Sequence, residues 1–88
     1  MHSRYHQRIP IHGKVALFEA QKLNAHLLDV SSAGFAIRLE QRRVLRLGQR
    51  CRAILNIDSH FISCDVDLIY QSALRVGCKV VAISTASQ

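Results

Sequence analysis

The chain has 88 residues, enough for one small domain, and 49% of them are hydrophobic, so it can bury a core. Its net charge of +6 favours an anionic partner such as nucleic acid, a nucleotide or an acidic membrane surface. No apolar run approaches the roughly 20 residues of a transmembrane helix. The polar, basic N-terminus lacks the apolar core of a secretory signal.

The three cysteines, Cys51, Cys64 and Cys78, form no CxxC motif, and an odd count fits neither a disulfide framework nor a zinc ribbon. Each lies on the apolar face of an expected strand, so we interpret all three as small buried hydrophobic side chains. Free thiols of this kind are typical of a reducing cytosol. The pair His2 and His6 has helical metal-ligand spacing but no acidic or thiol neighbour, so no metal site is expected.

Residues 1–12 are polar and basic, and Pro10 would interrupt any helix that continued through them. We expect an extended arm that becomes ordered when a ligand binds. Residues 13–84 are then a β-barrel domain, and residues 85–88 are a polar tail.

Beyond the arm, apolar and polar residues alternate with the period of two that is typical of strands. Leu23, Ala25 and Leu27 share one face, and the same alternation would carry Asp29 and Ser31 inward at the rim of the core. Further strands are expected at residues 14–19, 35–39, 49–57, 60–70 and 74–82. Tyr70 is expected to face inward with the apolar residues of its strand, and residues 71–72 to form a turn.

Residues 40–48 are the least strand-like part and are expected to form a loop or a helical turn that carries Arg42, Arg43 and Arg46. The simplest interpretation is a solvated basic loop, and the functional alternative is a supporting role in attracting phosphate. Six strands, short turns and no convincing long helix predict an all-β fold, a small six-stranded antiparallel β-barrel.

Sequence signatures of enzymes are missing, including GxSxG, HExxH, the Walker loop and GxGxxG. Asp65 and Asp67 share a strand face, but an exposed polar face explains them without a catalytic cleft. The chain is therefore expected not to be an enzyme and to carry no cofactor.

Two short motifs remain. Arg4 and Arg8 form RxxxR in the arm, and Asp29, Ser31 and Gly34 form DxSxxG after an apolar strand. Taken alone, the first could be two solvated charges and the second a polar hairpin turn. In this order and spacing the two motifs resemble those of the PilZ family, bacterial receptor domains for cyclic di-GMP. Residues 75–80 also resemble the last barrel strand of that family.

The resemblance implies that Arg4, Arg8, Asp29, Ser31 and Gly34 bind cyclic di-GMP. The ligand is a dianion with two guanines. A guanidinium matches the O6 and N7 acceptors of guanine or a phosphate. A carboxylate accepts from guanine N–H groups, and a glycine leaves room for close approach.

The expected function is a cytoplasmic receptor, free or within a membrane-associated system, whose arm orders over the ligand and signals to a protein effector or fused domain. A homodimer contact could add stability. The alternatives are an adaptor of the same fold that binds protein and not nucleotide, and a basic barrel that binds single-stranded nucleic acid. The C-terminal helix that family members commonly carry is missing from this sequence.

Overall fold

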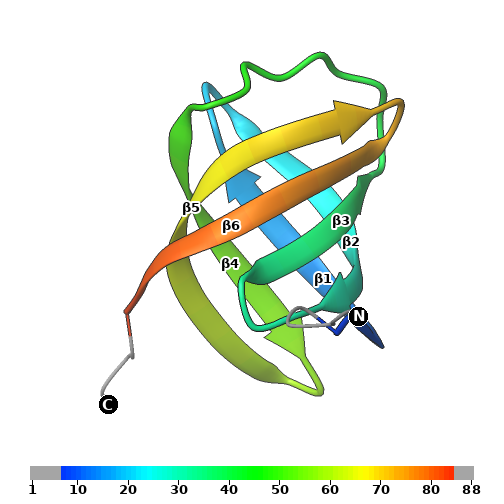
Figure 1. The fold of residues 1–88 in the computed structure, drawn as a ribbon, viewed down its shortest axis with the longest axis vertical. Helices are drawn as coiled ribbons and strands as arrows, with labels where there is room; N and C mark the ends of the chain where they lie inside the picture. The colour runs from blue at the N-terminus through cyan, green and yellow to red at the C-terminus, as the bar shows by residue number, and fades with distance from the viewer. Residues whose placement is uncertain (1–6, 85–88) are drawn as a thin grey trace, which may run out of the picture.

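The computed structural model of the protein describes residues 7–84, and these form six antiparallel strands that close into a barrel (Figure 1). The strands are β1 (Ile9–Phe18), β2 (Lys22–Val30), β3 (Gly34–Leu39), β4 (Arg50–Ile57), β5 (His60–Ser72) and β6 (Arg75–Ser84). Neighbours around the barrel follow the order β1-β2-β3-β6-β5-β4, and β4 closes onto β1. The predicted fold class and strand number are confirmed. The described part contains no helix long and apolar enough to cross a membrane.

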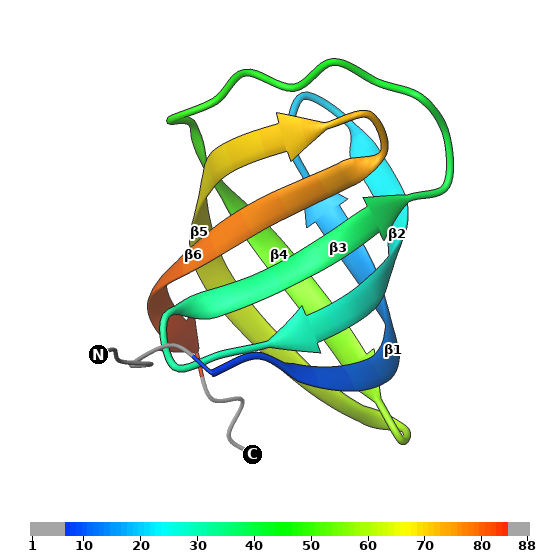
Figure 2. The same cartoon turned by 45° about the vertical axis from the view of Figure 1, so that its right-hand side comes forward.

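The barrel interior is apolar because the alternate residues that point inward along the strands are hydrophobic, most of them aliphatic. Leu17, Ile37, Val66, Leu68 and Val76 are fully buried there. The tilted strands that enclose this core are clearest in Figure 2.

All three cysteines belong to the core, as expected from their position on apolar faces. Burial raises the pKa of Cys51 to about 11 and that of Cys78 to about 12, and it also raises the pKa of Cys64. The thiols are therefore packing groups, with little thiolate character at neutral pH.

The first strand begins earlier than predicted. Ile9 pairs with Val30 and Pro10 with Asp29, so residues 9–12 are barrel strand and do not belong to an arm that ends at residue 12. Proline is tolerated here because β1 pairs with β4 only over residues 14–18, so at Pro10 the strand has β2 as its single neighbour and one side of its backbone needs no N–H donor.

A bulge in β2 reverses the predicted orientation of Asp29. Leu27 pairs with Ile37, but Asp29 pairs with Ala36, so Leu28 is an extra residue on β2. Val30 then packs against the core, and Asp29 faces outward. The expected continuation of the inward face through Asp29 is wrong, because one inserted residue inverts the alternation that follows it.

A second bulge, in β5, corrects the placement of Tyr70. Leu68 pairs with the inward Cys78, and Tyr70 pairs with the next residue of β6, Gly77, which leaves Ile69 as the extra residue. Tyr70 consequently faces outward. Strand β5 also continues through Ser72, so the predicted turn at residues 71–72 lies instead at residues 73–74.

Candidate ligand-binding site

The turn between β2 and β3 contains Ser31 and leads into Gly34. The Ser31 amide donates to the carbonyl oxygen of Gly34 at 2.8 Å, and Ser31 Oγ accepts from the Ala33 amide at 3.3 Å. The Val80 amide in β6 donates to the carbonyl oxygen of Ala33 at 3.1 Å, which ties the turn to the neighbouring strand. Ser31 therefore helps to form the turn, which agrees with the polar hairpin turn given above as the structural alternative for this motif. Its hydroxyl lies directly after the end of β2.

Gly34 is required by the barrel itself. A Cβ at this position would lie 2.0 Å from the carbonyl oxygen of Cys78, a backbone atom that cannot move aside. Glycine lets β3 and β6 approach each other at this point. The motif glycine thus has a structural reason that is independent of any ligand.

Asp29 lies between two arginines. Arg8 Nε donates to Asp29 Oδ1 at 2.7 Å, and Arg8 Nη2 is also 2.7 Å from that oxygen. Arg75 Nη2 donates to the other carboxylate oxygen, Oδ2, at 3.1 Å. The Asp29 side chain is only 14% exposed, whereas the Arg8 and Arg75 side chains are 44% and 43% exposed. The carboxylate is held in place, and both guanidinium groups remain open to solvent on one side.

Arg75 also connects Asp29 with an aromatic ring. Arg75 Nε donates to the hydroxyl of Tyr70 at 3.1 Å. This bond and the bond to Asp29 both raise the pKa of Arg75. The Tyr70 ring covers Gly77, where a Cβ would meet the ring at 2.2 Å. The contacts therefore run in one line across the outer face, from Arg8 through Asp29 and Arg75 to Tyr70.

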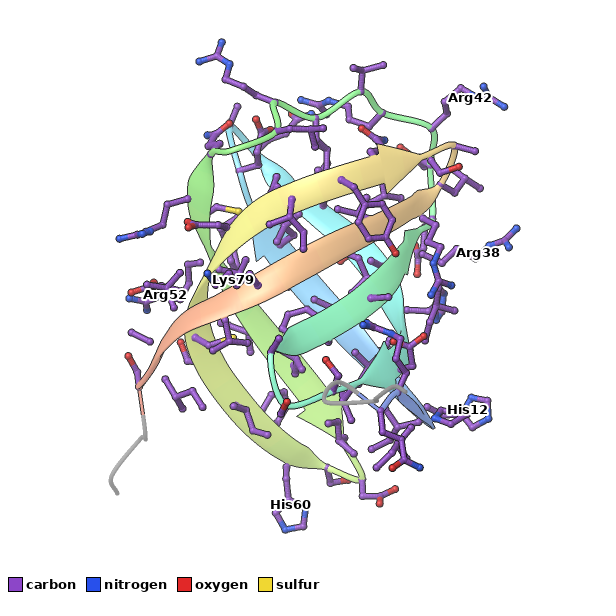
Figure 3. All side chains as sticks on the ribbon, in the orientation of Figure 1. His12, Arg38, Arg42, Arg52, His60 and Lys79 are labelled. Carbon is purple, nitrogen blue, oxygen red and sulfur yellow. The ribbon has the colours of Figure 1, made fainter. Side chains whose placement is uncertain are left out.

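A shallow depression opens beside this line, with a volume of about 360 Å³ that includes open solvent. It is lined by residues of both motif regions and of β5 and β6, among them Arg8, Ser31, Gly34, Tyr70 and Lys79. Lys79 is exposed on β6 (Figure 3). The depression is thus surrounded by two basic side chains, Arg8 and Lys79, by the polar turn at Ser31 and by the ring of Tyr70.

Four of the five predicted ligand residues fall within the described part. Arg8 and Asp29 are in direct contact although 21 positions separate them in the sequence, and Ser31 and Gly34 line the adjoining depression. Arg4 lies outside the described residues, as do His2 and His6. Within residues 7–84 there is no group of three or more His, Cys, Asp or Glu side chains that could hold a metal ion.

The sequence analysis missed Arg75, Tyr70 and Lys79 as neighbours of the motifs. Two small residues could have indicated these neighbours. Ala36 pairs with Asp29 on one side and with Gly77 on the other, and Gly77 pairs with Tyr70, so two small outward positions separate Asp29 from Tyr70. Small outward side chains leave space above the sheet, and longer neighbours then lie across it.

A comparison with known protein families gives the decisive observation. Residues 2–88 match the PilZ domain. The chain belongs to the PilZ family. The resemblance noted in the sequence is thereby confirmed over essentially the whole chain. PilZ domains are a family of cyclic di-GMP-binding modules and are in general receptors, not enzymes. A search of curated proteins gave no match.

Proposed function

We propose that this PilZ domain is a receptor for cyclic di-GMP and that the ligand binds over the depression beside Arg8, Asp29 and Ser31. The observation that carries the proposal is the Arg8–Asp29 contact, which joins the RxxxR and DxSxxG motifs on the outer face. The family match supports the choice of ligand.

The chemistry of the surrounding groups suits a guanine dinucleotide. Asp29 would accept from N1–H and N2–H of a guanine, a match that adenine does not offer. Arg8, joined by Arg4, would donate to a phosphate or to guanine O6 and N7. The Tyr70 ring, 39% exposed at the rim, would stack on a base.

In the free protein Arg8 already occupies one oxygen of Asp29, so ligand binding would exchange partners. The Arg8 guanidinium would turn to the ligand, and guanine N–H groups would replace it at the carboxylate. Arg75 would keep its bond to Oδ2 throughout and hold the carboxylate in orientation. The exchange would move the residues around Arg8, and this movement is the signal that we propose is passed to a downstream effector or fused domain in the bacterial cytoplasm.

The proposal is tested by isothermal titration of the purified chain with cyclic di-GMP, with cyclic di-AMP as the competing cyclic dinucleotide. We expect saturable binding of the guanine ligand and much weaker binding of the adenine ligand. Arg8→Ala should weaken binding about tenfold or more, because a charge-assisted hydrogen bond contributes about 1.5–3 kcal/mol. The melting temperature of the free protein should hardly change, because an exposed ion pair contributes about 0–1 kcal/mol.

Arg46→Ala serves as the matched control, because it removes one exposed arginine from the loop at the other end of β3. It should leave the affinity at the wild-type value. Absence of heat from a folded wild-type chain would refute the receptor function and direct attention to a protein-binding adaptor. Equal affinity of the wild type and Arg8→Ala would remove Arg8 from the site.

A further inference from the structure

The longest connection between described strands, residues 40–49 between β3 and β4, has features that ligand binding does not explain. We name it the arginine loop because it carries Arg42, Arg43 and Arg46. The loop arches over one end of the barrel and extends past the strand ends (Figures 1 and 2). Arg42 projects from this end, and His60, in the β4–β5 hairpin, marks the opposite end (Figure 3).

The arginine loop is anchored at its middle. Leu45 is 5% exposed and belongs to the core cluster, and its amide donates to Gln71 Oε1 at 2.9 Å. Gln71 Nε2 donates to the carbonyl oxygens of Arg43 at 2.5 Å and of Ala73 at 3.1 Å. A buried side chain and a bridging amide therefore fix the loop, so the side chains around Leu45 have defined directions.

With Leu45 directed inward, its aliphatic neighbours point into solvent. Val44 is 89% exposed and Leu47 is 49% exposed, although both are residues that normally contribute to a core. Arg42 and Arg46 are exposed on either side of Val44. The nearest acid along the chain, Glu40, lies 3.2 Å from His26 Nε2, and among the described residues no ion pair joins Glu40 to Arg42 or Arg46.

We infer that the arginine loop docks the protein on an anionic membrane surface. Lipid phosphates would accept from Arg42 and Arg46, whose aliphatic stems can lie along the interface. Val44 and Leu47 would enter the boundary between headgroups and acyl chains. Basic residues with interspersed aliphatic side chains are the combination that binds such surfaces, since charge attraction and apolar burial add.

Other anionic partners fit the arginine loop less well. Single-stranded nucleic acid is usually held by aromatic rings that stack on bases, and residues 40–49 contain no aromatic residue. A protein partner would need a broad complementary surface, whereas the exposed aliphatic side chains sit on a narrow loop that extends past the strands. A deformable lipid surface can accommodate such an apex.

This docking surface is separate from the candidate ligand site. Strand β3 begins at Gly34 beside the motif turn and ends at Leu39 before the arginine loop. Six residues of strand span roughly 20 Å, so the motif turn and the loop lie at opposite ends of this strand. The inference therefore does not depend on the proposed receptor function.

The absence of tryptophan from the sequence allows a direct test. Val44→Trp places a single fluorescent reporter at the apex of the arginine loop. Phe61→Trp is the matched control, because Phe61 is 68% exposed and lies next to His60 at the other end of the barrel. Each variant of the 88-residue chain is titrated with vesicles of phosphatidylcholine alone and with vesicles that also contain the anionic lipid phosphatidylglycerol.

We expect a blue shift at position 44 with the anionic vesicles only, reversed by about 0.5 M salt, and no shift at position 61. In the chain without tryptophan, Arg42→Glu should reduce co-sedimentation with anionic vesicles about fivefold or more, since each arginine near the surface contributes measurably to binding. Lys14→Glu, the same charge change at an exposed position of β1, should have a much smaller effect.

Three results would overturn the inference. One is the absence of both co-sedimentation of the wild type and any shift at position 44. Another is a shift at position 61 without one at position 44, which would assign the membrane contact to the opposite end. The third is a response at position 44 to single-stranded RNA but not to vesicles, which would make the arginine loop a nucleic-acid contact.

Discussion

Asp29 shows at the residue scale how two arginines can hold one carboxylate at the same time. Two guanidinium groups hold its two oxygens separately, so one partner can leave while the other remains. The two arginines therefore have different expected effects. Arg8 would contact the ligand, whereas Arg75 would be a positioning residue that acts through Asp29 and Tyr70.

Arg75→Met should weaken cyclic di-GMP binding about tenfold, because loss of the bond to Oδ2 leaves the Asp29 carboxylate free to rotate. In an Asp29→Asn background the same change should cause little further loss, and a double-mutant cycle by titration calorimetry measures this coupling. Arg52→Met, which removes an arginine paired with Asp65 on β4 and β5, is the control. Additive losses at Arg75 and Asp29 would contradict the positioning role.

Gly34 can be tested for its structural role without any ligand. Gly34→Ala should lower the free energy of unfolding by about 2 kcal/mol or more, since the new Cβ would overlap the Cys78 carbonyl and force β3 and β6 apart. Gly48→Ala introduces a side chain where φ is +84° and nothing lies within 4 Å, so it reports backbone strain alone. Chemical denaturation should rank Gly34→Ala as the more damaging change. The reverse order would mean that the barrel can relax at this point.

At the scale of strands, the sequence predicts well where the strands lie. It predicts which side chains face inward only for the residues before each bulge in β2 and β5. The period of two locates all six strands, and the β4–β5 turn falls between two of the predicted strands, at Asp58 and Ser59, where both have positive φ. The extra residues Leu28 and Ile69 are themselves aliphatic, so each bulge reads as a continued apolar strand. Two adjacent apolar residues are a sequence signal for such a bulge, but they do not show which of the two is the extra residue.

The candidate site was predictable as a set of motif residues but not as a geometry. Arg8 and Asp29 could be named because their motifs resemble those of the PilZ family, whereas their contact depends on the β2 bulge that turns Asp29 outward. Arg75 and Tyr70 join them only because the β5 bulge turns Tyr70 to the same face. Long-range register therefore decides which side chains meet, and the local pattern does not contain it.

The outer face of β4 and β5 carries an ion pair that makes stability depend on pH. Arg50 Nε donates to Asp67 Oδ1 at 2.9 Å, and this hydrogen bond is the main cause that lowers the pKa of Asp67 in the folded state. A carboxyl whose pKa is lower in the folded than in the unfolded protein stabilises the fold above its unfolded pKa. That contribution is lost as pH falls through the folded pKa.

Asp67→Asn should therefore reduce stability at neutral pH and flatten its decline between about pH 5 and pH 2. Thermal unfolding across this range provides the measurement. Asp58→Asn, in the β4–β5 turn, is the charge-matched control, so the difference between the two variants isolates the ion pair. Parallel curves for the wild type and Asp67→Asn would show that Asp67 has the same pKa in both states, and the ion pair would then add no pH-dependent stability.

At the scale of the whole molecule, barrel closure protects the thiols, because every strand has two neighbours and the interior has no open edge. Burial raises the pKa of Cys51 to about 11 and of Cys78 to about 12, so at pH 8 only about one Cys51 thiol in a thousand would be ionised. Reaction with a disulfide reagent should require opening of the barrel. Cys51, 8% exposed against 2% for each of the other two, should react first.

Thiol labelling at pH 8 can therefore report barrel opening and, through it, ligand binding. Native protein should react far more slowly than protein in guanidinium chloride, where all three thiols are accessible. If cyclic di-GMP binds only the closed barrel, a ligand concentration of 100 Kd should slow labelling about a hundredfold when opening limits the reaction. Arg8→Ala should lose this protection yet label at the wild-type rate without ligand. Fast labelling of Cys51 alone, unaffected by ligand, would instead reveal local fraying of β4 that leaves the site intact.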